Sequence, residues 1–146
     1  MKKIYFLLFL SLISAGLTAQ TVSILGNLGT SGNIVVGASN YHVSETIYTE
    51  NEVGAGNFLS APTAIESINF FINLEGVPTT VPNFKIYLRN VPLATTTFAT
   101  GAYSTAGYTL VYDGVYNATS ITGIAGVTLT TPFVRTAGTN LQMLIE

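Results

Sequence analysis

The 146-residue chain contains no cysteine, a single histidine and few charged side chains. The absence of cysteine excludes disulfide bonds, thiolate metal sites, a cysteine nucleophile and a lipid anchor attached to cysteine. After residue 19 the only basic residues are Lys85, Arg89 and Arg135, against seven acidic ones. The charge balance therefore argues against nucleic acid and anionic membrane surfaces as partners, because so few cations cannot neutralise a row of phosphates.

The chain also has no apolar run long enough for a membrane span. Its longest, residues 4–12 (IYFLLFLSL), is shorter than the roughly 20 residues that cross a bilayer. The run follows Lys2-Lys3 and tapers into small residues that end at Ala19, before Gln20. This order predicts a secretory signal peptide over residues 1–19, and a buried N-terminal helix is the alternative. We therefore expect a protein that is secreted or held at the cell surface, and the lack of cysteine favours a bacterial source.

Residues 20–146 have the length of one domain and predict an all-β fold. Four segments alternate apolar and polar side chains, at residues 66–73, 84–89, 127–133 and 140–146. Shorter candidate strands lie at residues 22–25, 33–36, 45–48, 95–98 and 109–112. Period-two alternation with one apolar face is typical of half-buried antiparallel strands. Eight or nine such strands predict an antiparallel two-sheet β-sandwich, jelly-roll or immunoglobulin-like, with a barrel as the alternative.

Turn-forming residues separate these segments. Pro78 and Pro82 predict a loop over residues 75–83, and Pro92 ends the strand before it. Asp113-Gly114 is a signal for a hairpin or a bulge. The alternation of residues 141–145 is still running near Glu146, which predicts that the domain is truncated there and that further domains follow in the same chain.

Candidate catalytic groups are scarce. His42 has Ser44 and Glu45 nearby in the sequence, but no G-x-S-x-G elbow accompanies them and strand neighbours do not converge. We interpret His42 as a surface or loop-edge imidazole and expect no enzymatic activity.

Glu50, Asn51 and Glu52 form an acidic segment that is expected to be a loop. The favoured interpretation is a solvated surface. The alternatives are a structural cation site, since calcium takes six to eight oxygen ligands, and the paired carboxylates of a glycoside hydrolase. We expect no cofactor, with a structural calcium ion at these three residues left open.

Tyr103 and Tyr108 lie in a polar segment flanked by Gly101 and Gly107. A tyrosine ring is apolar and its hydroxyl forms hydrogen bonds, so such a loop suits sugars and peptides. The glycines do not indicate a phosphate loop, because no Lys-Ser/Thr pair follows them. Tyr103 and Tyr108 are the predicted ligand-binding residues, and packing of both rings on the edge of the sandwich is the alternative.

An ordered set of short motifs resembles the N-terminal β-sandwich domain, jelly-roll or adhesin-like, of bacterial surface proteins exported by type IX secretion. The motifs are residues 46–56 (TIYTENEVGAG), 65–70 (IESINF), 84–88 (FKIYL), 110–114 (LVYDG), 132–133 (PF) and 140–141 (NL). The resemblance implies adhesion or carbohydrate binding and carries no active-site residues. One departure is that the C-terminal sorting domain of this export route does not occur in the sequence.

Together these features predict a secreted, non-catalytic cell-surface module that binds a glycan or a protein, or that acts as a spacer. Two alternatives stay open. One is an accessory domain of a secreted hydrolase whose catalytic part lies downstream, and the other is a structural subunit of a matrix or fibre.

Overall fold

The computed structural model describes residues 43–53, 63–72, 79–118 and 123–146 of the chain. These residues form six strands and one helical turn, in the order β1 (Ser44–Tyr48), α2 (Glu50–Val53), β2 (Thr63–Ile72), β3 (Thr79–Pro92), β4 (Thr109–Ala118), β5 (Gly123–Arg135) and β6 (Thr139–Ile145). The predicted signal peptide, His42 and the candidate strands at residues 22–25 and 33–36 lie outside the described residues. No helix in the described part of the chain is long and apolar enough to cross a bilayer.

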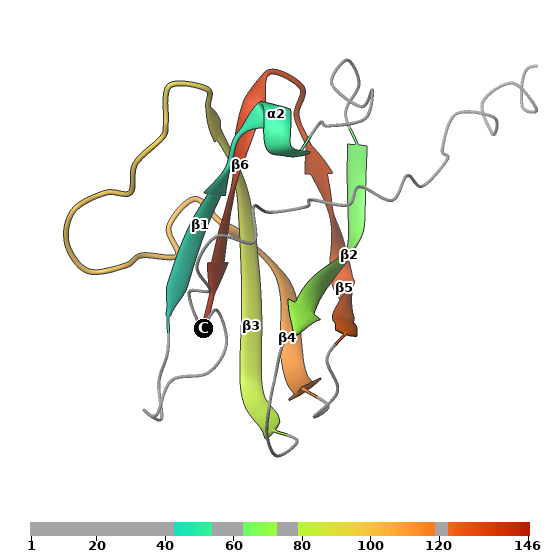
Figure 1. Ribbon diagram of the computed structural model, residues 1–146. Coiled ribbons are helices and arrows are strands. Elements are labelled where there is room, and N and C mark those ends of the chain that lie inside the picture. The colour runs from blue at the N-terminus through green and yellow to red at the C-terminus, as the bar shows by residue number, and fades with distance from the viewer. Residues whose placement is uncertain (1–42, 54–62, 73–78, 119–122) are drawn as a thin grey trace, which may run out of the picture.

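The six strands form two antiparallel sheets that pack face to face (Figure 1). The larger sheet has the strand order β1-β6-β3-β4, and the smaller one pairs β2 with β5. Phe70 of β2 joins the two layers, because its ring meets the ring of Phe84 edge-on at 6.3 Å and that of Tyr116 at 5.9 Å. Such aromatic pairs contribute about 0.5–1.5 kcal/mol beyond area burial. The prediction of an all-β antiparallel sandwich is confirmed.

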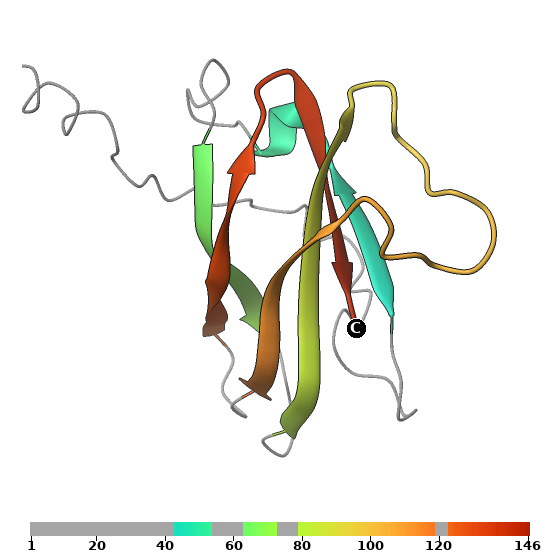
Figure 2. The ribbon, with the colours of Figure 1, turned by 180° about the vertical axis from the view of Figure 1, so that it is seen from behind.

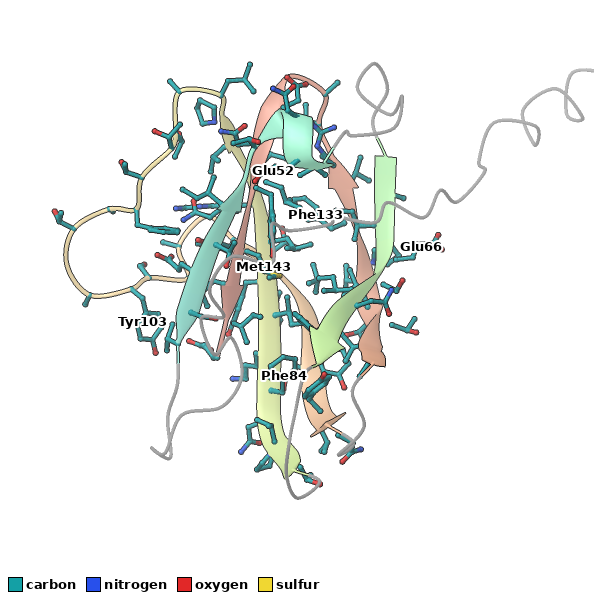
Figure 3. All side chains as sticks on the ribbon, in the orientation of Figure 1. Glu52, Glu66, Phe84, Tyr103, Phe133 and Met143 are labelled. Atoms are coloured by element: carbon teal, nitrogen blue, oxygen red, sulfur yellow. The ribbon has the colours of Figure 1, made fainter. Side chains whose placement is uncertain are left out.

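The core is built from the alternating side chains of the strands. Figure 3 shows Phe84, Phe133 and Met143 between the two layers, while Glu66 and Tyr103 lie outside them. The buried apolar side chains that form one cluster are Val53, Phe84, Ile86, Leu88, Val111, Tyr116, Val127, Leu129, Phe133, Leu141, Met143 and Ile145. The alternation therefore identified the inward face of β3, β5 and β6.

Strand β6 differs from the expected half-buried strand because both of its faces are buried. Leu141, Met143 and Ile145 point into the core, but Gln142 is only 1% exposed and Leu144 is 0% exposed on the other face. The cause is the position of β6 between β1 and β3, where outward side chains of both neighbours flank it. The polar residues of β6 are thus internal hydrogen-bonding groups and not a solvated face.

Three local predictions were wrong. Residues 95–98 are not a strand: they belong to the connection between β3 and β4, which begins with a turn closed by the bond from Thr95 N to Pro92 O (2.8 Å). The loop predicted for residues 75–83 ends earlier, because β3 begins at Thr79. The segment at Glu50 is a helical turn instead of a loop.

Pro82 is accommodated within β3 by a bulge. Val81 pairs with Tyr116 and Phe84 with Gly114, so two residues of β3 face one of β4, and Asn83 has a positive φ of 57°. A proline has no N–H to donate to a ladder, and an irregular register tolerates it. Asp113-Gly114 therefore lies within β4, next to the bulge of β3, and forms no hairpin turn.

Candidate functional site

The connection between β3 and β4, residues 93–108, projects from one side of the sandwich and is called here the 93–108 loop (Figure 2). Residues 99–106 of this loop form one wall of an open pocket of about 300 Å³ on the outward face of the larger sheet. The pocket is lined by Glu45, Arg89, Ala99, Gly101, Ala102, Tyr103, Ser104 and Ala106. Glu45 comes from β1 and Arg89 from β3, so the pocket joins the loop to two strands that β6 separates.

Local sequence fixes the shape of the loop. Tyr108 N donates to Thr105 O at 3.1 Å, which closes a four-residue turn, and Gly107 at its third position has a φ of 79°. A type II turn requires this positive φ, which favours glycine. Ser104 Oγ accepts a further bond from Ala106 N at 3.2 Å. Residues 104–108, which follow Tyr103, are therefore held together by hydrogen bonds within the loop.

Arg89 attaches the loop to the sheet by three contacts. Its Nε donates to Gln142 Oε1 at 2.9 Å, and its Nη1 donates to Ala106 O at 3.3 Å. The guanidinium carbon also lies 4.2 Å from the centre of the Tyr108 ring, in a cation–π contact. The side chain of Gln142, which is buried on the outward face of β6, therefore has a hydrogen-bond partner, and the guanidinium is held in one position.

Tyr108 connects Arg89 to the acidic side of the pocket. Its hydroxyl donates to Glu45 Oε1 at 3.0 Å. Burial raises the pKa of Tyr108, and the bond to Glu45 raises it further, while the positive charge of Arg89 opposes the shift. Tyr108 therefore stays a neutral hydrogen-bond donor, and its hydroxyl proton remains bonded to the carboxylate of Glu45.

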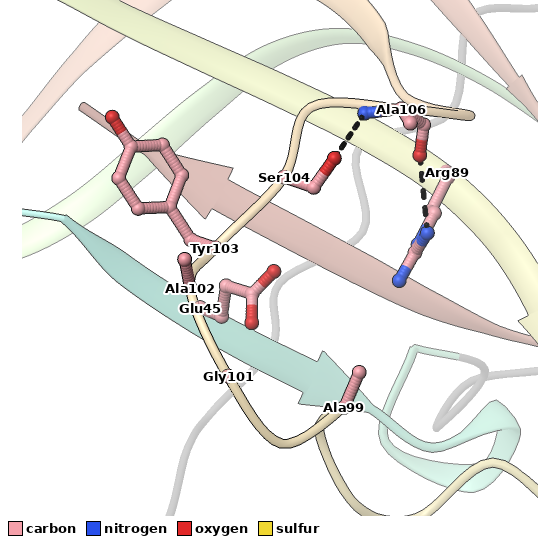
Figure 4. Close-up of a pocket in the computed structure, with 8 residues that line it drawn as sticks. All are labelled: Glu45, Arg89, Ala99, Gly101, Ala102, Tyr103, Ser104 and Ala106. Atoms are coloured by element: carbon pink, nitrogen blue, oxygen red, sulfur yellow. Dashed lines mark hydrogen bonds between the residues drawn. The ribbon is translucent and has the colours of Figure 1, made fainter.

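After these contacts, both charged groups keep hydrogen-bonding capacity. Glu45 Oε2 takes no part in the bond to Tyr108. A guanidinium has five N–H groups, of which Arg89 uses one for Gln142 and one for Ala106 besides its side-chain contact with Tyr108. Figure 4 shows Glu45 beneath the loop, with Tyr103 at one end of the site and Arg89 at the other. Tyr103 lines the pocket and is 53% exposed. The pocket therefore offers a hydrogen-bond acceptor, a donor and an accessible aromatic ring.

The structure brings one of the two predicted tyrosines into the pocket wall and gives the other a supporting position. Tyr103 lines the pocket, while Tyr108 holds Glu45 and Arg89 in place. Glu45 and Arg89 were not predicted as site residues. The signal for Arg89 was its place on the outward face of the alternating segment at residues 84–89, and only the strand order reveals that Glu45 belongs with it.

The second predicted site, at Glu50, Asn51 and Glu52, has a different organisation. Glu52 Oε2 accepts bonds from Thr49 N at 2.7 Å and from Thr49 Oγ1 at 2.8 Å, and Glu52 N in turn approaches Thr49 Oγ1 at 3.4 Å. This reciprocal arrangement is a capping box at the start of α2. The backbone bond to Thr49 and then the hydroxyl bond lower the pKa of Glu52. Glu52 is therefore used to cap the helical turn.

Glu50 takes part in a buried polar corner formed with Arg135, Gly138 and Asn140. Its Oε1 accepts from Gly138 N at 2.7 Å and lies 3.6 Å from Nη2 of Arg135, a residue that is 1% exposed. Asn140 accepts from Glu50 N at 2.9 Å and donates to the carbonyls of Leu93 and Thr95. Within the described residues no group of three histidine, cysteine or acidic side chains could hold a metal ion. The contacts of Glu50 and Glu52 do not converge on a common point, so the geometry does not favour the calcium alternative.

Comparison of the chain with protein-family models, with curated proteins and with solved structures found no match. The resemblance to domains of type IX-secreted surface proteins stays a prediction.

Proposed function

We propose that the chain is a secreted, non-catalytic binding or adhesion module of the cell surface, and that its ligand, a glycan or a protein, enters the pocket beneath the 93–108 loop. One observation carries the proposal: Glu45 and Arg89 are each held in place by internal hydrogen bonds, yet each keeps hydrogen-bonding capacity in a pocket that the exposed ring of Tyr103 also lines. Preorganised polar groups in a concave site are the usual form of a binding pocket. Loops on a rigid β scaffold are also the usual place for recognition.

The composition of the pocket supports binding over catalysis. Glycoside hydrolysis uses two carboxylates, and Glu45 is the one acidic residue among those that line the pocket. Ser104 is the one lining hydroxyl of a serine or threonine, and its oxygen accepts the amide of Ala106 instead of lying beside a general base. The predicted signal peptide at residues 1–19 supports export and a location at the cell surface.

The experiment is a binding screen of the protein purified after expression of the full chain in a bacterial host. Immobilised glycans and immobilised extracellular proteins are the probes, and p-nitrophenyl glycosides and casein test for turnover. We expect binding in one panel and no turnover. Turnover lost on replacement of Glu45, or absence of binding in both panels, would contradict the proposal.

Variants of two exposed aromatic residues locate the contact. Tyr103→Ala should reduce binding at least tenfold, since tyrosines are enriched among the residues whose truncation costs most in interfaces and this exposed ring is the one aromatic group among the residues that line the pocket. Phe98→Ala is the matched control, because Phe98 is 44% exposed on the same loop and does not line the pocket. Equal losses from both variants would place the contact on the loop as a whole instead of in the pocket.

A further inference from the structure

The pocket is lined by one carboxylate, that of Glu45, and one guanidinium, that of Arg89, which do not pair with each other. Glu45 and Arg89 are carried by β1 and β3, whose axes are about 10 Å apart because β6 lies between them. Among the described residues the ion pair within 4.0 Å is that of Arg135 with Glu50, so the two pocket charges are further apart than that distance. They are separated and fixed, because Tyr108 contacts Glu45 with its hydroxyl and Arg89 with its ring.

These two charges disfavour a ligand that carries charge of one sign only. A ligand with a negative charge would be attracted by Arg89 and repelled by Glu45. A ligand with a positive charge would be attracted by Glu45 and repelled by Arg89. Glu45 Oε2 can only accept a hydrogen bond, and the remaining N–H groups of Arg89 can only donate. A hydroxyl group satisfies both, because it donates and accepts while carrying no charge.

The other walls suit a ring of saturated carbon and hydroxyl groups. Tyr103 offers an exposed aromatic face, onto which the apolar C–H face of a sugar can pack. Ala99, Gly101, Ala102 and Ala106 contribute small side chains and leave the pocket open. Its volume of about 300 Å³ is at the lower end of the range of about 300–1,000 Å³ for ligand sites, so the pocket takes a small unit.

We propose that this pocket binds one ring of an uncharged carbohydrate, whose hydroxyl groups donate to Glu45 and accept from Arg89 while one face of the ring packs on Tyr103. This inference rests on the proposed function, since it names the ligand class of the same pocket. Tyr108 is a positioning residue: it holds Glu45 through its hydroxyl and Arg89 through its ring, without lining the pocket itself.

The test compares three sets of oligosaccharides on the purified protein by isothermal titration calorimetry. The neutral set contains glucan, galactan and mannan oligomers, the acidic set oligogalacturonate and sialyllactose, and the basic set chitosan oligomers. We expect the wild-type protein to bind a member of the neutral set and to bind the charged sets at least tenfold more weakly. A preference for the acidic or the basic set would overturn the inference.

Glu45→Gln gives the sharper result. Loss of the charge should weaken binding of the neutral oligomer about tenfold, since charge-assisted hydrogen bonds are roughly twice as strong as neutral ones. The same variant should gain affinity for oligogalacturonate, because Arg89 is then the one charge in the pocket wall. Unchanged selectivity in Glu45→Gln would overturn the assignment of Glu45.

Tyr108→Phe separates a loosened loop from a lost ligand contact. This variant removes the bond to Glu45 and keeps the carboxylate charge, so it should weaken binding without the change in selectivity. A gain of affinity for the acidic set in Tyr108→Phe would contradict the inference. Binding of an extracellular protein with no glycan bound would also overturn it and leave the proposed function standing, whereas absence of binding in every panel contradicts the proposed function itself.

Discussion

The protein contains two clusters in which a glutamate and an arginine come from different elements, and they differ in whether the two charges pair with each other. In the corner at Arg135, Glu50 Oε1 accepts from Gly138 and lies 3.6 Å from the guanidinium, which also donates to Thr139 O. In the pocket, Glu45 and Arg89 are bonded to neighbours but not to each other. The first cluster contains an ion pair inside the fold, where Arg135 Nε is buried without a hydrogen-bond partner in the part of the chain that the structure describes, and the second has two charged groups that face an open pocket without pairing.

This difference separates a stabilising role from a binding role. Removal of one partner from a buried pair leaves an uncompensated charge, which is strongly destabilising. An acid at the wall of an open pocket can be rehydrated when its partner is lost, so its removal affects the fold little. The same residue types therefore predict opposite consequences in the two clusters, in stability for the corner and in affinity for the pocket.

The largest expected effect comes from Glu50→Ala. It leaves the buried guanidinium of Arg135 without its acid, and we expect a loss of about 3 kcal/mol in the free energy of unfolding, the lower end of the range for a broken buried pair because Glu50 itself is partly exposed. Urea unfolding followed by circular dichroism measures this. Glu45→Ala is the matched control in the pocket, with an expected loss of about 1 kcal/mol. Equal losses in the two variants would remove the distinction between the clusters.

Asn140→Ala should have the next largest effect. Asn140 is 2% exposed, and its side chain accepts from Glu50 N and donates to two carbonyls of the 93–108 loop. Loss of these bonds leaves buried polar groups unsatisfied, and we expect a destabilisation of about 2 kcal/mol. Because Asn140 supports the start of the loop, hydrogen exchange at Thr95 should accelerate. Wild-type exchange there would mean that the loop is held by Arg89 alone.

Thr49→Ala removes the capping box and should cost about 1 kcal/mol at neutral pH. The pKa of Glu52 is lowered in the folded state, so its contribution is present above the unfolded value of 4.5 and is lost as the pH falls through the lower folded value. The difference in stability between wild type and variant should therefore shrink below about pH 4. Urea titrations at neutral and acidic pH measure it, and a constant difference would refute the role of Glu52.

Tyr108→Phe should have the smallest effect on stability, about 0.5 kcal/mol, because its bond to Glu45 is partly exposed. The pKa of Tyr108 is raised, so its contribution is complete below the unfolded value of 10.0 and is lost as the pH rises through the higher folded value. Ultraviolet titration should show one tyrosine fewer in the most alkaline step of the variant. Burial and a bond to Glu146 also raise the pKa of Tyr87, to about 12, and this step should remain.

The sequence contained enough information for the class of fold and for part of the site. Alternation at Phe84, Ile86 and Leu88 predicts the inward face of β3 because the period of a strand is fixed by its backbone. Tyr103 could be identified from its glycine-flanked loop. Which strands are neighbours is a non-local property, so the meeting of Glu45 with Arg89 across β6 could not be read from either segment.

Local errors have equally specific causes. The four-residue turn α2 is too short to display a helical apolar stripe, although Thr49-x-x-Glu52 has the spacing of a capping box. Residues 95–98 contain β-favouring threonines, but Asn140 binds the carbonyls of Leu93 and Thr95 and holds this segment away from the sheet. Tertiary contacts here override the local preference.

The central position of β6 in the larger sheet has a consequence for how the chain folds during synthesis. Strand β6 is the last of the described strands, and it alone joins β1, the first of them, to β3. The ribosome therefore releases β1 and β3 long before the strand that connects them exists as peptide. Folding must wait for residues 139–145 and then close a contact between distant parts of the chain, and such high contact order gives folding times of milliseconds to seconds.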